Sequence, residues 1–165
     1  MEGGEADPRS IPLGTRHTRH IPNSARPEWD PDDLRDGLAR CLKDFPLLQT
    51  RSITATYNCV GMALASRRTW VDPDQVPLIL SDDGYTQLAT EAEARVGDLV
   101  LYKDASGQIR HIGVVIQRIE NIASATVGVK ILSKWGPWAE FVHDPRDVYM
   151  SWGTPSEYWT DRKAV

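Results

Sequence analysis

The chain has 165 residues and a mass of 18.5 kDa, which is the size of one ordinary domain. Hydrophobic residues make up 41% and charged residues 25%, a balance typical of soluble globular proteins that excludes a wholly disordered chain. The formal net charge is −4 and no long basic run is present, so we expect no nucleic-acid partner. Cys41 and Cys59 are too few thiols for a disulfide scaffold or a four-thiolate zinc site, and we expect no metal or other cofactor.

The first 28 residues are rich in Gly, Pro, Arg, His and Ser and show no hydrophobic period. We interpret residues 1–28 as a polar tail or linker and residues 29–165 as a single domain, with Ile11, Leu13 and Ile21 able to pack on it. The start has no apolar core like that of a signal peptide, and no run approaches the roughly 18 apolar residues of a membrane span. We therefore expect a cytoplasmic protein, with signal-independent export left open.

Two helices are expected in the first half of the chain. Asp30 is a good N-cap, Pro31 suits the first turn, and an apolar stripe with helical spacing follows until Pro46. The stripe consists of Leu34, Leu38, Cys41, Leu42 and Phe45. A second helix is expected over residues 58–66 with Asn58 as its cap, followed by an irregular connection over 67–90 that includes one short helix.

From residue 96 onward the pattern changes to strands. We expect strands over 99–102, 109–116 and 127–133, because short apolar or alternating runs are separated there by turn residues. Four of the six tryptophans lie from Trp135 onward, in a region expected to form strands and loops that close the sheet. Helices followed by short strands predict an antiparallel sheet packed on helices, which is an α+β domain.

Cys59 and His111 are the residues most suited to chemistry. Cys59 would lie in the first turn of a helix, where free N–H groups and the helix dipole favour a thiolate and can stabilise an oxyanion. His111 lies inside a predicted strand, and Gly113 on the same face would leave space beside its ring. If Arg118 pairs with Thr126 in the hairpin, Ser133 lies opposite His111 and can orient the imidazole.

These residues resemble the papain-like cysteine hydrolases of the NlpC and CHAP type. In that group a cysteine opens a helix, a Gly-Asp pair opens the strand before the histidine, and the next strand supplies a polar residue. The matching residues in this sequence are Cys59, Gly97-Asp98, His111 and Ser133. The resemblance covers roughly residues 55–135.

The resemblance implies an α+β fold of the papain-like, NlpC type, in which a helix bearing Cys59 packs on a small antiparallel sheet bearing His111. It also implies amide hydrolysis through an acyl-thioester, with Cys59 as the nucleophile and His111 as general base and acid. The expected partner is then a peptide or a peptidoglycan-like substrate. Delivery as an effector or toxin would add a cognate inhibitor or immunity protein.

Several roles stay open at this point. The third catalytic residue is Ser133, His143 or Lys134, since a register slip of one residue would bring Lys134 opposite His111. The aromatic and polar neighbours Tyr57, Asn58 and Trp135 are expected to contact substrate. Two alternatives to a hydrolase are a non-catalytic binding module on the same fold and an acyl transferase.

Overall fold

The first helix, α1, spans Pro31–Asp44 and confirms the predicted helix. Asp30 caps it by accepting a hydrogen bond from the backbone N–H of Asp32, and Pro31 occupies the first turn. The buried residues of α1 include Leu34 and Cys41, so the apolar stripe faces the core. The computed structural model that provides this description covers residues 8–163.

The second helix, α2, spans Cys59–Leu64 and begins directly after its predicted cap. The Asn58 side chain accepts a hydrogen bond from the Gly61 backbone N–H at 2.9 Å. The same side chain also bonds both the N–H and the carbonyl of Val71, at 3.1 and 2.7 Å. Asn58 therefore fixes the start of α2 against the loop that follows it.

The connection after α2 contains the expected short helix, α3, at Val76–Asp82, directly preceded by a 3-10 turn, η1, at Pro73–Gln75. Two further 3-10 turns, η2 at Glu91–Glu93 and η3 at Met150–Trp152, lie before β3 and before β7. The strands are β1 (Gln49–Ile53), β2 (Thr86–Gln87), β3 (Leu99–Lys103), β4 (Ile109–Asn121), β5 (Thr126–Lys134), β6 (Ala139–His143) and β7 (Thr154–Thr160).

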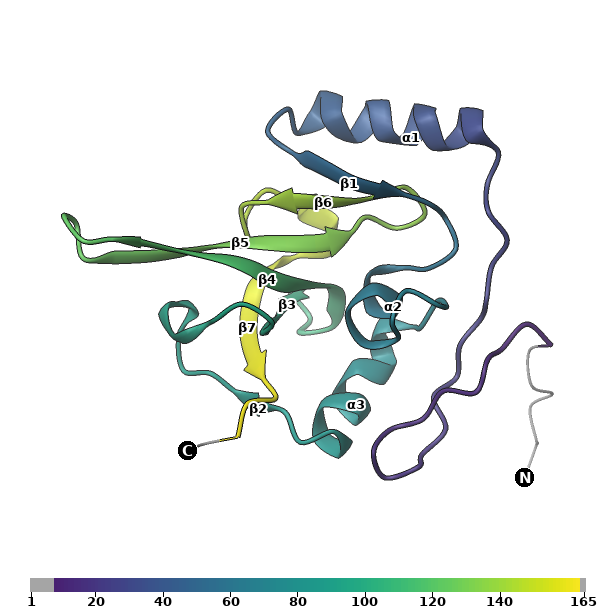
Figure 1. Ribbon diagram of the computed structural model, residues 1–165, viewed down its shortest axis with the longest axis horizontal. Coiled ribbons are helices and arrows are strands. Elements are labelled where there is room, and N and C mark those ends of the chain that lie inside the picture. The colour runs from purple at the N-terminus through teal and green to yellow at the C-terminus, as the bar shows by residue number, and fades with distance from the viewer. Residues whose placement is uncertain (1–7, 164–165) are drawn as a thin grey trace.

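Within residues 8–163 these strands form one antiparallel sheet of seven strands in the order β1-β6-β5-β4-β3-β7-β2 (Figure 1). The expected papain-like fold, with a helix on a small sheet, is therefore wrong. The reason lies in the end of the chain, where β6 pairs between β5 and β1 and β7 pairs between β3 and β2. The sheet therefore continues on both sides of the three expected strands, with β6 and β1 beyond β5 and with β7 and β2 beyond β3.

The predicted register between β4 and β5 is also wrong. Arg118 pairs with Val129 and not with Thr126, which pairs instead with Asn121. The reason is that β4 runs several residues beyond its predicted end before the chain turns, and a bulge over residues 115–117 shifts the register again.

This register changes the surroundings of His111. Ser133 of β5 pairs with Phe141 of β6. The expected pairing of Ser133 with His111 of β4 is not observed. The space expected beside Gly113 is also filled, since a Cβ there would lie 2.4 Å from Ile131 Cγ2. Close packing of β4 on β5 therefore requires glycine at this position.

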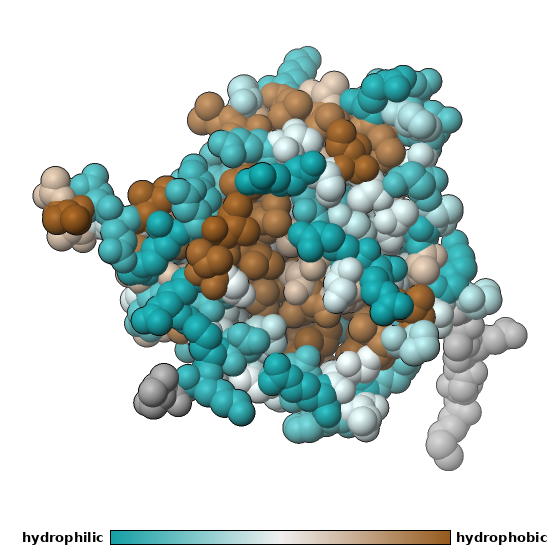
Figure 2. Space-filling view, viewed as in Figure 1, coloured by the Kyte–Doolittle hydropathy of each residue, from teal (hydrophilic) through white to brown (hydrophobic). Residues whose placement is uncertain are grey.

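Two apolar clusters lie on the opposite faces of the sheet in the described chain. The first, the α1-side cluster, includes Cys41 of α1 together with Val100, Tyr102, Val115, Val129, Ile131, Trp135 and Phe141. The second, the α2-side cluster, includes Cys59 and Val60 of α2 and Ile79 of α3 together with Leu99, Leu101 and Ile112. Figure 2 shows apolar residues in the middle of the viewed face, between the strands and α3, with polar residues around them.

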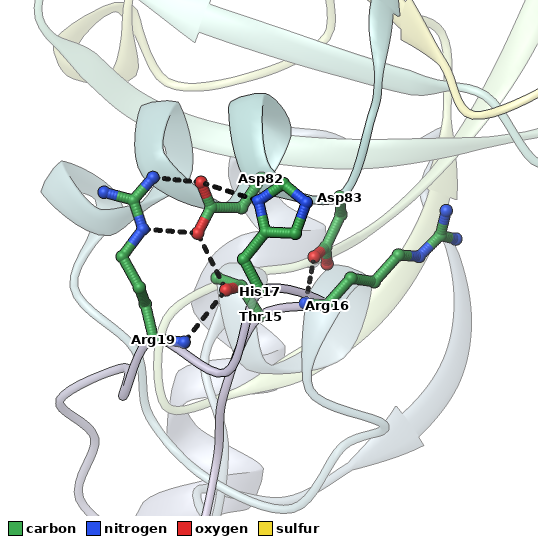
Figure 3. Close-up of polar contacts among 6 residues, drawn as sticks. All are labelled: Thr15, Arg16, His17, Arg19, Asp82 and Asp83. Atoms are coloured by element: carbon green, nitrogen blue, oxygen red, sulfur yellow. Dashed lines mark hydrogen bonds and ion pairs between the residues drawn. The ribbon is translucent and has the colours of Figure 1, made fainter.

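The segment 8–28, expected to be a polar tail, lies along α3 and α2. Ile21 is buried in the α2-side cluster. Asp82, at the end of α3, accepts hydrogen bonds from Thr15 Oγ1 at 2.8 Å and from Arg19 Nε at 2.6 Å (Figure 3). Arg16 donates its backbone N–H to Asp83 at 2.7 Å. Among the described residues, no helix is long and apolar enough to cross a membrane.

Candidate functional site

Cys59 is the first residue of α2 and is 6% exposed. Burial raises the pKa of its thiol to about 11. The backbone N–H groups of Ile112, Val60 and Cys59 itself, and the charge of Lys134, act in the opposite direction. The thiol is therefore the resting form at neutral pH, in surroundings that contain several groups able to stabilise a thiolate.

His111 lies on β4 and is 1% exposed. Its ring stacks on Trp152 with centroids 4.5 Å apart and lies 5.3 Å from the ring of Tyr102, its partner on β3. The Nε2 atom of His111 is buried, and none of the described residues forms a hydrogen bond with it. Burial, together with the nearby His143, lowers the pKa of His111 to about 3, so the imidazole is neutral at pH 7.

The peptide bond between His111 and Ile112 connects these two candidates. Side chains alternate along a strand, so Ile112 faces the α2-side cluster with Cys59 while His111 faces Tyr102 on the other side. The Cys59 thiol thus lies beside the backbone of the residue that follows His111. Within residues 8–163, no hydrogen bond joins the His111 Nε2 atom to Cys59.

Ser133 and His143 form a separate buried pair. Ser133 Oγ lies 2.7 Å from His143 Nε2, and Trp135 Nε1 donates to the same oxygen at 3.1 Å. His143 Nδ1 donates to the carbonyl of Asp144 at 2.7 Å, which leaves Nε2 as the acceptor of the Ser133 hydroxyl proton. Every partner in this chain of hydrogen bonds is satisfied, so the structure connects Ser133 to His143 and not to His111.

Trp135, expected as a wall of the substrate groove, is instead a core residue with no exposed surface. Its ring makes edge contacts with Phe45, Phe141 and Trp152 at centroid distances between 5.1 and 5.2 Å. The reason is the tight turn after β5, which returns the chain into β6 and folds the indole onto the sheet. It therefore lines no groove in this structure.

Tyr57 is also buried, and its hydroxyl donates to Glu140 Oε1 at 2.7 Å. Arg67 binds the same carboxylate through Nε at 2.5 Å and through a second nitrogen at 3.2 Å. Tyr57 and Asn58, both expected to bind substrate, thus hold the chain directly before Cys59 in place. The pair formed by the buried Glu140 and the exposed Arg67 had no signal in the sequence, because the two residues are 73 positions apart.

Lys134 is the least expected member of this region, since its side chain is completely buried. Its Nζ donates to the carbonyl of Gly136 at 2.6 Å and lies 5.3 Å from the ring centroid of Tyr57. Burial lowers the pKa of Lys134 to about 8. Sequence reasoning reached Lys134 only through a register slip, because lysine is seldom buried and no pattern marks the exception.

The described residues contain no cluster of three or more His, Cys, Asp or Glu side chains that could hold a metal ion. An open hollow with a volume of about 370 Å³ lies next to Asn58, the residue before Cys59. Its other lining residues include Trp70, Val71 and Asp72, and Arg26 stacks on the Trp70 ring at 3.8 Å. One of its lining residues, Asn58, is adjacent in sequence to the candidate nucleophile.

Comparison with known proteins adds one relationship. The profile of a family described as a domain of unknown function, DUF7689, matches residues 48–160. That stretch contains all seven strands, α2 and every candidate site residue, whereas α1 and the segment before it lie outside. No curated protein and no solved structure matches the chain.

Proposed function

The chain belongs to the DUF7689 family, and we propose that it is an amide hydrolase with Cys59 as its nucleophile. One observation carries the proposal: Cys59 opens α2, the backbone N–H groups of Val60 and Ile112 favour a thiolate there, and a hollow lies beside Asn58, the residue before it. His111, expected as the general base, faces Tyr102 and Trp152 on the other side of the sheet and is not part of the proposed site.

The proposed reaction begins with loss of the Cys59 proton to a solvent water molecule. The thiolate sulfur then forms a bond to the carbonyl carbon of an amide, and the carbonyl π electrons move to oxygen. Collapse of this intermediate breaks the C–N bond, and the amine leaves with a proton taken from solvent. A water molecule then cleaves the thioester, which releases the acid and the Cys59 thiol.

His111 takes no part in this reaction, because its ring packs against Tyr102 and Trp152 on the face of the sheet opposite to Cys59. Its pKa of about 3 would also make it a poor base for a thiol, since an efficient general base has a pKa near the working pH.

Backbone N–H groups around the thiol supply a second element of the proposed site. Those of Ile112, Val60 and Cys59 favour negative charge on the sulfur. Similar groups stabilise the oxyanion of acyl-transfer intermediates, where one such donor contributes about 3–4 kcal/mol. The substrate we propose is a peptide amide, with wall peptides as one candidate class, entering by the hollow beside Asn58.

The proposal is tested with an activated acyl ester, p-nitrophenyl acetate, and with a panel of peptide and muropeptide amides. We expect an acetyl thioester on Cys59, identified by mass spectrometry and cleaved by hydroxylamine, and release of new amines from at least one amide class. Cys59→Ala should abolish both, whereas Cys41→Ser should leave both unchanged.

Acylation that persists at full rate in Cys59→Ala would refute a cysteine nucleophile. A stable acetyl thioester that transfers to added amines but not to water would instead identify an acyl transferase. Circular dichroism of each variant establishes that lost activity is not lost folding.

A further inference from the structure

Lys134, the last residue of β5, carries an ammonium group with no exposed surface. Burying an ion without compensation is unfavourable by several kcal/mol, so a buried lysine normally has a close carboxylate partner. Among the described residues, no carboxylate oxygen lies within 4.0 Å of Lys134 Nζ, although the half-buried Lys103 does form such a pair with Glu157. The charge must therefore be balanced in another way.

One acceptor and one aromatic ring surround the ammonium. Lys134 Nζ donates to the Gly136 carbonyl at 2.6 Å, and the Tyr57 ring centroid lies 5.3 Å away. An ammonium carries three N–H donors, so the carbonyl uses one of them. Glu140, its cross-strand partner, is already bound by Arg67 and by the Tyr57 hydroxyl.

Four titratable groups act on Lys134 through their charge: Glu140 of β6, Cys59 of α2, Glu28 of the N-terminal segment and Cys41 of α1. Glu28 is engaged by the backbone N–H of Ala55 at 2.6 Å, Glu140 by Arg67, and Cys41 lies in the α1-side cluster. Gly113 lies next to Ser133 across β4 and β5, so Lys134 and Ile112, the next residue on each strand, share one face of the sheet. Ile112 packs with Cys59 in the α2-side cluster, which makes Cys59 the group of the four that lies on the side of Lys134 and is engaged by no other charge.

We infer that the Lys134 ammonium is the counter-charge of the Cys59 thiolate, which makes Lys134 a positioning residue of the proposed site. This inference rests on the proposed function only for the role of the thiolate as a nucleophile. The electrostatic coupling between Lys134 and Cys59 is measurable without a substrate. Tyr57, two residues before Cys59, lies under the ammonium and so fixes the distance between the charge and the start of α2.

Opposite charges stabilise each other reciprocally, so each group must shift the titration of the other. With Lys134 protonated, the Cys59 thiol loses its proton at a lower pH than it would beside a neutral side chain. The effect must fade once Lys134 itself loses its proton. This dependence on pH distinguishes an electrostatic role from a structural one.

The test measures alkylation of Cys59 by iodoacetamide between pH 6 and pH 10.5, in a Cys41→Ser background. Lys134→Met should slow alkylation about tenfold near pH 7, which corresponds to one unit in the thiol pKa. The two rates should converge at the upper end of the pH range. Lys130→Met, four residues earlier on the same strand, is the matched control and should alkylate at the parent rate.

Lys134→Arg keeps the charge and does not titrate in this range, so it should keep the advantage over Lys134→Met up to the highest pH. Equal alkylation profiles for Lys134→Met and its parent across the pH range would overturn the inference.

The two proposals fail separately. If the titrations are coupled but no amide or ester acylates Cys59, the counter-charge stands and the hydrolase does not. If Cys59 is acylated equally fast with Met or Lys at position 134 at every pH, the hydrolase stands and the counter-charge does not.

Discussion

The Nε2 atom of His143 lies 2.7 Å from the hydroxyl oxygen of Ser133, and both side chains are buried. The Asp144 carbonyl fixes the proton of His143 on Nδ1, so Ser133 donates to Nε2 and accepts from the indole N–H of Trp135. One hydroxyl therefore satisfies two other buried polar groups. Its place in the core is explained without any role in proton transfer at Cys59.

We predict that Ser133→Ala destabilises the fold, because it leaves His143 Nε2 and Trp135 Nε1 without partners. Each unsatisfied buried group is unfavourable by about 1–3 kcal/mol, measured as the change in unfolding free energy from urea titration. Ser156→Ala, at an exposed hydroxyl on β7, should change stability by less than about 0.5 kcal/mol. If Ser133→Ala kept full stability but lost Cys59 acylation, Ser133 would be catalytic.

The helices were predictable because local signals determine them. Asp30 and Pro31 define the start of α1, and Asn58 defines the start of α2, through hydrogen bonds within three residues. The three central strands were predictable for the same reason, since their alternation reflects burial on the α1-side and α2-side clusters. Each of these elements carries its own pattern.

The register and the edges of the sheet were not predictable. The hairpin between β4 and β5 has no Asn-Gly or Asp-Gly turn to fix its position, and its positive φ falls on Ala125. The edge strand β1 has four exposed residues of five, so no apolar pattern marks it. Partners such as Lys134 and Tyr57 depend on that register, which is why the site around Cys59 emerges only from the fold.

Acidification should weaken the fold through its buried histidines. Burial lowers the pKa of both His111, to about 3, and His143 below their ordinary value of about 6.5, so the unfolded chain binds more protons below that pH. The two histidines thus make their full contribution to the free energy of unfolding above pH 6.5, and this contribution falls as the pH drops below that value. We expect about 1.4 kcal/mol per pH unit for each histidine until its folded pKa is reached, measured by urea titration from pH 7 to pH 4.5.

The contribution of His111 is isolated with His111→Phe, which keeps a ring against Trp152 and removes the titrating nitrogen. The slope of the unfolding free energy against pH should decrease by the contribution of one histidine, about 1.4 kcal/mol per pH unit. An unchanged slope in His111→Phe would show that His111 keeps its ordinary pKa in the folded state.

The N-terminal segment should depend on Asp82 for its position. Arg19, through its hydrogen bonds, lowers the pKa of the Asp82 carboxyl, so docking is complete above the ordinary carboxyl pKa and weakens as the pH falls below it. Asp82→Ala removes the acceptor of Thr15 and Arg19, and hydrogen exchange should speed up over residues 13–21. Asp74→Ala, on an exposed turn, is the control; equal protection in both variants would disprove the role of Asp82.

Gly61 should be irreplaceable in α2, because a Cβ at this position would lie 1.9 Å from the carbonyl oxygen of Thr69. Gly61→Ala must displace either α2 or the loop held by Asn58, at a typical overpacking penalty of about 1–3 kcal/mol in the free energy of unfolding. Since Cys59 lies two residues earlier, its acylation rate should fall as well. Gly128→Ala on β5 meets nothing within 4 Å and should leave both stability and acylation at parent values. Parent-like behaviour of Gly61→Ala in both measurements would mean that α2 tolerates movement and that the position of Cys59 does not depend on this packing.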